Sequence, residues 1–238
     1  MSDRNVFIYW EGDEPPLISI LRDLIYKFSN NEKNYKVIFL NDKNIEQFID
    51  LEPDYWKLAV NHKSDFIRAK VIFKYGGIWL DSDTLVMSDL GKLFEILESK
   101  EGFLIKENNK IICTGVFGAR KNSEFLKEWI DRTEVAIKKD NLLWSEIGPF
   151  MVDSIFRSTE LCKNFIVFNG LDTMYPVNWD QCPKEFLLNN NINKIKKDFQ
   201  PLIVLVNSVY KQTSKMSKKQ IIYMNNNLGF LLREAIQK

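Results

Sequence analysis

The sequence is poor in histidine and cysteine, the residues on which many catalytic and metal sites depend. Its 238 residues include one histidine, His62, and three scattered cysteines, Cys113, Cys162 and Cys182, with no C-x-x-C pair. Sites built from several histidines are therefore excluded, and His62 is expected to be a partly exposed residue at the entry of a helix. An odd number of dispersed cysteines favours a reducing compartment and argues against a zinc site.

The sequence also lacks long apolar runs and an excess of charge of either sign. No segment approaches the roughly 20 apolar residues of a membrane span, and no apolar leader opens the chain. We therefore expect a cytoplasmic protein, at most peripheral at the inner face of a membrane. The net charge of +1 gives no field for binding nucleic acid. Lysines cluster only at 194–197 and 211–219, which indicates solvated loops or contact with anionic lipid headgroups.

The chain alternates between predicted strands and helices, which is typical of a doubly wound α/β fold. With 45% hydrophobic and 13% aromatic residues, residues 1–238 can bury the core of a single domain. Strands are expected at 5–10, 35–40, 78–80, 103–105, 111–118 and 202–206. Helices are expected at 17–28, 44–49, 54–60, 64–75, 89–97, 123–138, 145–156 and 218–236, the last interrupted near 225–227. Segment 162–198 shows no clear period, and we expect acceptor specificity there.

Two carboxylates, Asp81 and Asp83, follow the short apolar strand at 78–80. Side chains at i and i+2 of a strand share a face, so these acids can converge on one cation at the end of the strand. Mg²⁺ and Mn²⁺ are commonly held by one or two carboxylates together with substrate phosphates. The pattern predicts a site for a nucleotide or phosphate ester, and the plain alternative is a solvated turn.

The helix predicted before this strand carries Asp65 and Arg68 at i, i+3 spacing. The strand that follows can bring this pair beside the two carboxylates. On spacing alone, an exposed ion pair on the helix surface explains Asp65 and Arg68 equally well. Lys63, Lys70 and Lys74 fall on a separate stripe that we expect to be solvated.

Together these segments resemble a known family. The chain has S-D-x-x-R at 64–68 and G-G-I-W-L-D-S-D at 76–83. Their order and spacing resemble the core of the sugar transferases that include bacterial capsular polysaccharide synthesis proteins, yeast-type initiating mannosyltransferases and clostridial glucosylating toxins. The opening V-F-I-Y-W-E-G at 6–12 is similar to the first strand of that family. The resemblance covers about residues 5 to 90.

This resemblance implies a GT-A fold: a Rossmann-like α/β domain that binds a nucleotide sugar, with a mixed central sheet and additional C-terminal helices. Residues 1–120 would form the donor-binding part and 121–238 the acceptor side. The implied reaction is the metal-dependent, retaining transfer of a hexose from a nucleotide sugar to a saccharide or lipid-linked oligosaccharide. A UDP-hexose is the first expectation for the donor and a GDP-hexose the second. The implied cofactor is Mn²⁺ or Mg²⁺, and the implied setting is capsular or surface polysaccharide synthesis.

The resemblance also implies roles for individual residues. The metal would be bound by Asp83, by Asp81 directly or through water, and by Ser208. The nucleotide sugar would contact Tyr9, Trp10, Ser64, Asp65, Arg68, Asp81, Ser82 and Tyr210. In detail, Trp10 would stack on the base, Asp65 and Arg68 would hold sugar hydroxyls, and Tyr210 would close over the diphosphate. The catalytic candidates are Asp65, Arg68 and, on the acceptor side, Asp180.

Alternatives remain open at several of these positions. Trp10 is equally well explained as a core aromatic, and the segment with Ser208 and Tyr210 as a core strand ending in a polar turn. Many relatives carry a histidine or an acid where this chain has only the apolar residues 204–206. The pattern at Asp81 and Asp83 also fits haloacid-dehalogenase-like phosphatases, with Asp81 as nucleophile, although their downstream acidic pair is missing. A carbohydrate-binding protein without catalysis is a further alternative.

Overall fold

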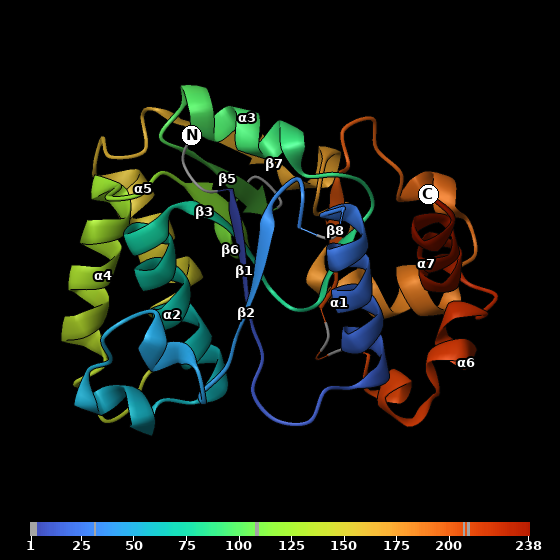
Figure 1. Cartoon of the computed structure of the whole chain (residues 1–238), viewed down its shortest axis with the longest axis horizontal. Coiled ribbons are helices and arrows are strands. Elements are labelled where there is room, and N and C mark those ends of the chain that lie inside the picture. The colour runs from blue at the N-terminus through green and yellow to red at the C-terminus, as the bar shows by residue number, and fades with distance from the viewer. Residues whose placement is uncertain (1–3, 31, 108–109, 207, 209) are drawn as a thin grey trace.

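A mixed sheet of six strands lies at the centre of the protein (Figure 1). The structure, a computed structural model, describes residues 4–30, 32–107, 110–206, 208 and 210–238. The sheet consists of β1 (Asn5–Tyr9), β2 (Lys36–Leu40), β3 (Gly77–Leu80), β5 (Gly102–Glu107), β6 (Ile111–Ala119) and β7 (Phe165–Asn169), in the spatial order β2-β1-β3-β6-β5-β7. β1 is parallel to β2 and β3, and β5 to β7, whereas β6 is antiparallel to β3 and β5.

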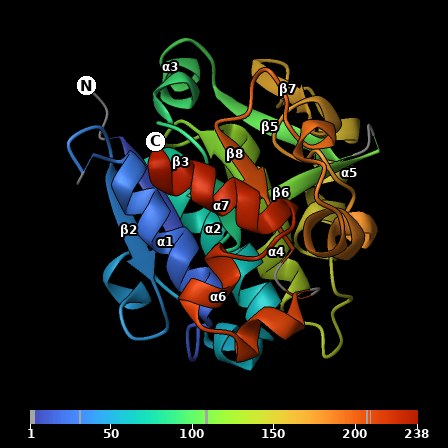
Figure 2. The ribbon, with the colours of Figure 1, turned by 90° about the vertical axis from the view of Figure 1, so that its right-hand side faces the viewer.

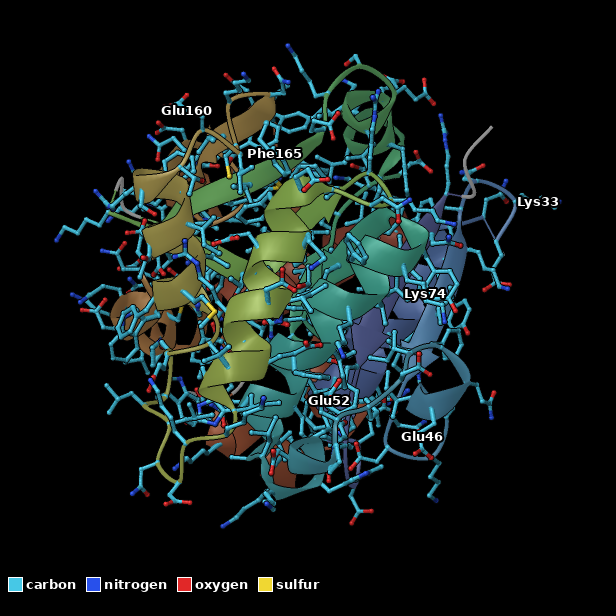
Figure 3. All side chains as sticks on the ribbon, turned by 90° about the vertical axis from the view of Figure 1, so that its left-hand side faces the viewer. Lys33, Glu46, Glu52, Lys74, Glu160 and Phe165 are labelled. Atoms are coloured by element: carbon cyan, nitrogen blue, oxygen red, sulfur yellow. The ribbon has the colours of Figure 1, made fainter. Side chains whose placement is uncertain are left out.

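Helices cover both faces of this sheet (Figure 1). One side carries α2 (Val60–Tyr75), α4 (Glu124–Ala136) and α5 (Pro149–Ser158), and Figure 3 shows α2 and α4 side by side. The other side carries α1 (Pro16–Phe28), α6 (Lys218–Ile222) and α7 (Asn227–Gln237), which face the viewer in Figure 2. α3 (Gly91–Ser99) lies at one end of the sheet. A second, two-stranded sheet pairs β4 (Thr84–Val86) with β8 (Leu202–Val204).

The alternation of side chains along β1 shows how this layering buries the core. Phe7 and Tyr9 pack into the apolar cluster that includes α2 and α4, whereas Val6 and Ile8 pack into the cluster on the opposite face of the sheet. Every residue of β1 is buried, as expected for a strand covered by helices on both sides. The predicted α/β class with a mixed sheet and C-terminal helices is confirmed. Among the described residues, no helix combines the length and apolar character needed to cross a bilayer.

Several predicted elements differ from the structure. β4 and β7 were not predicted, because β4 has only three residues and β7 lies in the segment without a clear period. The helices predicted at 44–49 and 54–60 are shorter 3₁₀ helices, Ile45–Gln47 and Pro53–Lys57. α2 begins at Val60 rather than at 64, and the interruption of the last predicted helix separates α6 from α7.

Two predictions about exposure on α2 are wrong. His62 is 7% exposed, and its ring nitrogen Nε2 donates to the backbone oxygen of Leu143 at 3.0 Å. Lys63 is equally buried, because its ammonium group pairs with Asp42 at 2.5 Å and with Glu11 at 3.2 Å. The sequence places both residues near the start of the predicted helix, but it does not reveal that loops cover them.

The turn between α2 and β3 generates a first prediction. Gly77 has φ of +116°, and a Cβ there would lie 2.3 Å from the Asn5 oxygen in the neighbouring strand β1. Gly77→Ala should lower the free energy of unfolding by about 2 kcal/mol or more, because it adds a clash to the backbone strain of positive φ. Gly12→Ala is the matched control, since Gly12 has φ of +87° but no heavy atom within 4 Å of its Cβ position. Equal losses in urea unfolding would show that β1 accommodates the added methyl group.

Candidate functional site

A cavity of about 570 Å³ opens where β1 and β3 end. Ligands of open α/β sheets bind outside the carboxyl ends of the strands, and this cavity lies there. Two other cavities, of about 540 and 670 Å³, lie beside α3 and at the turn before β3. Of these three, only the cavity at the strand ends contains the carboxylates that the sequence predicts to act together. We refer to it as the central cavity.

The turn from β3 to β4 presents Asp81 and Asp83 to the central cavity. The backbone N–H of Thr84 donates to the backbone oxygen of Asp81 at 3.0 Å, which closes the turn. The Ser82 hydroxyl donates to the backbone oxygen of Tyr9 at 2.6 Å and so ties the turn to the end of β1. Both acids therefore line one cavity, and Ser82, which the resemblance assigns to the donor, ties the turn to β1.

Arg68 joins α2, β6 and the β3–β4 turn. Its Nη2 lies 3.1 Å from Asp81 Oδ1 and 3.4 Å from Asp65 Oδ1. Nη2 also donates to the Ser64 hydroxyl at 2.8 Å, and Nε donates to the backbone oxygen of Ser64 at 3.1 Å. Nη1 donates to the backbone oxygen of Thr114 at 2.6 Å. Each guanidinium nitrogen thus has a protein acceptor, and Arg68 is 5% exposed. A bond from Arg68 to a sugar hydroxyl would have to replace one of these contacts.

Asp65 is a buried carboxylate at the same point. Burial raises its pKa to about 6, the nearby Arg68 guanidinium opposes this shift, and the Asp81 charge adds to it. Its carboxylate packs against Gly148, just before α5, where a Cβ would lie 2.4 Å from Oδ2. The loop before α5 therefore reaches Asp65 only because residue 148 is glycine.

Asp81 lies deep in the site but remains accessible from the central cavity, with 31% of its side-chain surface exposed. Trp79 Nε1 donates to Asp81 Oδ1 at 2.8 Å. Burial raises the pKa of Asp81, whereas Arg68 and the bond from Trp79 lower it. One oxygen of Asp81 is thus held by the protein, and Oδ2 makes none of these contacts.

Tyr9, Trp10 and Glu11 form the wall at the end of β1. The Tyr9 hydroxyl lies 2.7 Å from Asp42 Oδ1 and 3.0 Å from Glu11 Oε2, and burial together with the bond to Asp42 raises its pKa. Trp10 is half-buried, and its Nε1 donates to the backbone oxygen of Asp13 at 3.3 Å. Trp10 is therefore a cavity-wall residue as well as a neighbour of the core.

The central cavity brings together most of the predicted site residues. The predicted residues that line it are Tyr9, Trp10, Ser64, Asp65, Arg68, Asp81, Ser82, Asp83 and Ser208. Asp180 does not line it: this residue is exposed on a neighbouring turn, although its charge raises the pKa of Glu107 in the cavity wall.

Tyr210 corrects a further prediction. Its side chain is 1% exposed and lies among core residues, with its ring 6.3 Å from that of Phe186. Tyr210 is therefore a core residue and not a lid over a diphosphate. The predicted segment 202–210 also contains Asn207 and Val209, which lie outside the described residues.

Other wall residues escaped the sequence analysis. They are Glu11, Val60, Asn61, Glu107, Ile111, Ile112, Cys113, Thr114, Gly115, Trp144, Ser145, Pro149, Tyr175 and Val206. Many come from β6 and from the loop before α5, whose approach to α2 depends on long-range contacts. The available signal was weak: Thr114-Gly115 interrupts an apolar strand, and Ser145 begins a predicted helix.

The charges of the central cavity suit a cation. Five acids, Glu11, Asp65, Asp81, Asp83 and Glu107, line it with one base, Arg68. Among the residues that the structure describes, no three His, Cys, Asp or Glu side chains converge as a metal cage. Asp81, Asp83 and Ser208 nevertheless offer hard oxygen donors in one cavity, which fits a Mg²⁺ or Mn²⁺ ion completed by substrate phosphates.

The pKa of Asp65 predicts a pH dependence of stability. As pH rises from about 4 to above 6, the unfolded chain loses the Asp65 proton before the folded protein does, so ionisation destabilises the fold. Asn at this position does not ionise. Asp65→Asn should therefore gain stability relative to the parent, by on the order of 2 kcal/mol between pH 4 and pH 7. Urea unfolding across this range tests it, with Asp131→Asn on the exposed face of α4 as control, and a constant difference would contradict the assignment.

Comparisons with known proteins agree with this geometry. Residues 1–226 match the family model described as capsular polysaccharide synthesis protein. The O-glycosyltransferase PaGT of Phomopsis amygdali is 29% identical over 31% of this chain and 20% of its own length. The lactosylceramide 4-alpha-galactosyltransferase of Rattus norvegicus is 24% identical over 59% of this chain and 41% of its own length. The chain thus spans less than half the length of these two relatives.

Two solved structures share the fold. One is a glycosyltransferase involved in the glycosylation of the major capsid of PBCV-1, with a TM-score of 0.54, 12% identity and coverage of 90% of this chain and 98% of that one. The other is the apo-form glycosyltransferase GlyE of Streptococcus pneumoniae TIGR4, with a TM-score of 0.53, 13% identity and coverage of 99% and 63%. At this level of identity the likeness shows the GT-A fold alone.

Proposed function

The chain belongs to the family of capsular polysaccharide synthesis proteins, and on this premise we propose that it is a metal-dependent, retaining glycosyltransferase. It would move a hexose from a nucleotide sugar to a saccharide acceptor. The observation that carries the proposal is the meeting of Asp81 and Asp83 with Asp65 and Arg68 in one cavity at the ends of β1 and β3.

Some wall residues would bind the donor, and Arg68 would orient the acids that face it. Trp10 would stack on the nucleotide base, and Asp65 with Ser64 would face the donor sugar. Arg68 would keep Asp65 and Asp81 in place. Mn²⁺ or Mg²⁺, held by Asp81, Asp83 and Ser208, would offset the charge that develops on the departing diphosphate.

A hexose donor agrees with one of the relatives, which is a lactosylceramide 4-alpha-galactosyltransferase. We propose a UDP-hexose as the donor and a GDP-hexose as the second candidate. The acceptor would be a saccharide or a lipid-linked oligosaccharide used in capsule or surface polysaccharide synthesis. We further propose a cytoplasmic location with peripheral membrane contact through the lysines at 211–219, of which Lys211, Lys215, Lys218 and Lys219 are exposed.

The phosphatase alternative has less support. A phosphatase of that type needs a lysine at the phosphate, whereas the described wall of the central cavity contains none. Asp81, its nucleophile, has one oxygen held by both Trp79 and Arg68. A binding protein without catalysis would have no need for the acid-rich wall beside Asp65.

The metal requirement can be tested at Asp83. Asp83→Asn should abolish the rise in melting temperature that UDP produces in the presence of Mn²⁺, because a ligand of the cation is lost and binding to the folded state supplies that stabilisation. Melting without ligand should change little, since Asp83 is half-exposed. Asp131→Asn should behave as the parent does. A parent protein that UDP stabilises equally with Mn²⁺ and with EDTA would contradict the metal requirement.

The base-stacking role predicts a contrast between two tryptophans. Trp129 is 1% exposed, so Trp129→Ala should cost about 3 to 5 kcal/mol of stability. Trp10→Ala should cost less stability but weaken UDP binding at least tenfold, because its ring lines the central cavity. Calorimetric titration with UDP and Mn²⁺, combined with urea unfolding, measures both effects. If Trp10→Ala unfolds as easily as Trp129→Ala and still binds UDP as the parent does, Trp10 is a core residue.

A further inference from the structure

The entrance of the central cavity carries exposed apolar side chains. Trp144 is 74% exposed and Val60 is 52% exposed, yet both line the central cavity. Leu143 and Phe150, adjacent in the chain to this part of the wall, are 70% and 56% exposed. Single exposed apolar residues are common, but a group of them at a cavity is typical of a ligand-binding surface.

The backbone that carries Trp144 is held firmly by α2. Asn61 Nδ2 donates to the Trp144 oxygen at 3.1 Å, and His62 Nε2 donates to the Leu143 oxygen at 3.0 Å. The Leu143 N–H donates to Glu146 Oε2 at 3.0 Å, and Glu146 pairs with Lys139 at 2.7 Å. The exposed indole therefore projects from an anchored loop. Because the loop is already ordered, less conformational entropy is lost when a ligand binds to it.

The position of this loop relates Trp144 to the donor sugar. Four residues after Trp144, the same loop reaches Gly148, which packs against the Asp65 carboxylate. Trp10, the proposed base-stacking residue, lies on the β1 wall instead. Trp144 thus stands beside the proposed sugar end of the donor. The neighbouring Ser145 also lines the cavity, and its hydroxyl makes no hydrogen bond within the described part of the chain.

We propose that Trp144, flanked by Val60, is the stacking platform for a pyranose ring of the acceptor. One face of a pyranose ring is rich in C–H groups and packs on an aromatic ring, while its edge hydroxyls need polar partners such as Ser145. The side chain of Trp144 thus contributes to binding rather than to folding. The assignment of this ring to the acceptor rests on the proposed transferase function.

The test uses the full chain with UDP and Mg²⁺ and a panel of methyl glycosides of glucose, galactose, mannose and N-acetylglucosamine. Saturation-transfer NMR should detect binding of at least one glycoside to the parent. Trp144→Ala should weaken that binding at least tenfold, and Trp144→Phe should retain most of it. The melting temperature should stay unchanged, because the indole is exposed. UDP affinity should also stay unchanged, because Trp10 makes the proposed contact with the base. Trp56→Ala, at a tryptophan that is 48% exposed outside the cavity wall, is the matched control.

The other outcomes are distinguishable. Equal glycoside binding by the parent and Trp144→Ala, or no glycoside binding by a parent that binds UDP, would overturn the platform. A loss of UDP affinity in Trp144→Ala would place the indole on the donor and overturn the acceptor assignment. A parent that binds glycosides through Trp144 but shows no metal-dependent UDP binding would preserve the stacking site and remove the transferase function.

Discussion

The buried guanidinium of Arg68 is the contact on which both the fold around the site and its charge balance depend. It joins α2 to β6 through Thr114 and to the β3–β4 turn through Asp81. A buried charge is costly unless it is paired and hydrogen-bonded, and Arg68 meets both conditions. Arg68 also lowers the pKa of both Asp65 and Asp81, which opposes the effect of burial on each and the added repulsion of Asp65 by Asp81. One side chain therefore packs the helix and permits the acids to converge.

An acid-rich cavity constrains the ligands that can enter it. With five acids and one arginine in its wall, the central cavity repels a bare diphosphate and attracts a cation. Because Arg68 already has acceptors on each nitrogen, it has little capacity left for phosphate oxygens. On the proposed function, the nucleotide sugar would therefore bind beside this wall as a complex with a divalent cation. The charge pattern thus supports the proposed metal dependence.

The sequence predicted the parts of the site that depend on local pattern. Asp81 and Asp83 follow a strand, and Asp65 and Arg68 are i, i+3 neighbours on the preceding helix. Spacing allowed the two pairs to meet, and the resemblance to the sugar transferases assigned them to one site. Burial is different, because it depends on segments remote in sequence. Tyr210 was predicted to close over the diphosphate because it follows an apolar strand, yet its ring lies against Phe186 in the core. The part of the wall that comes from the loop before α5 was likewise not predicted. The loop approaches α2 through bonds from Asn61 and His62 to its backbone oxygens, which leave no pattern in the sequence.

α2 links the two halves of the proposed reaction. Its residues Asp65 and Arg68 order the donor side, while Asn61 and His62, one turn earlier, hold the loop that carries Trp144. The latter two bonds are made to backbone oxygens, so they place few demands on the side chains of that loop. The exposed side chains of Leu143 and Trp144 can therefore vary without disturbing these two bonds or the contacts of Arg68. On the proposed function, this arrangement would separate acceptor recognition by exposed side chains from the buried residues that face the donor.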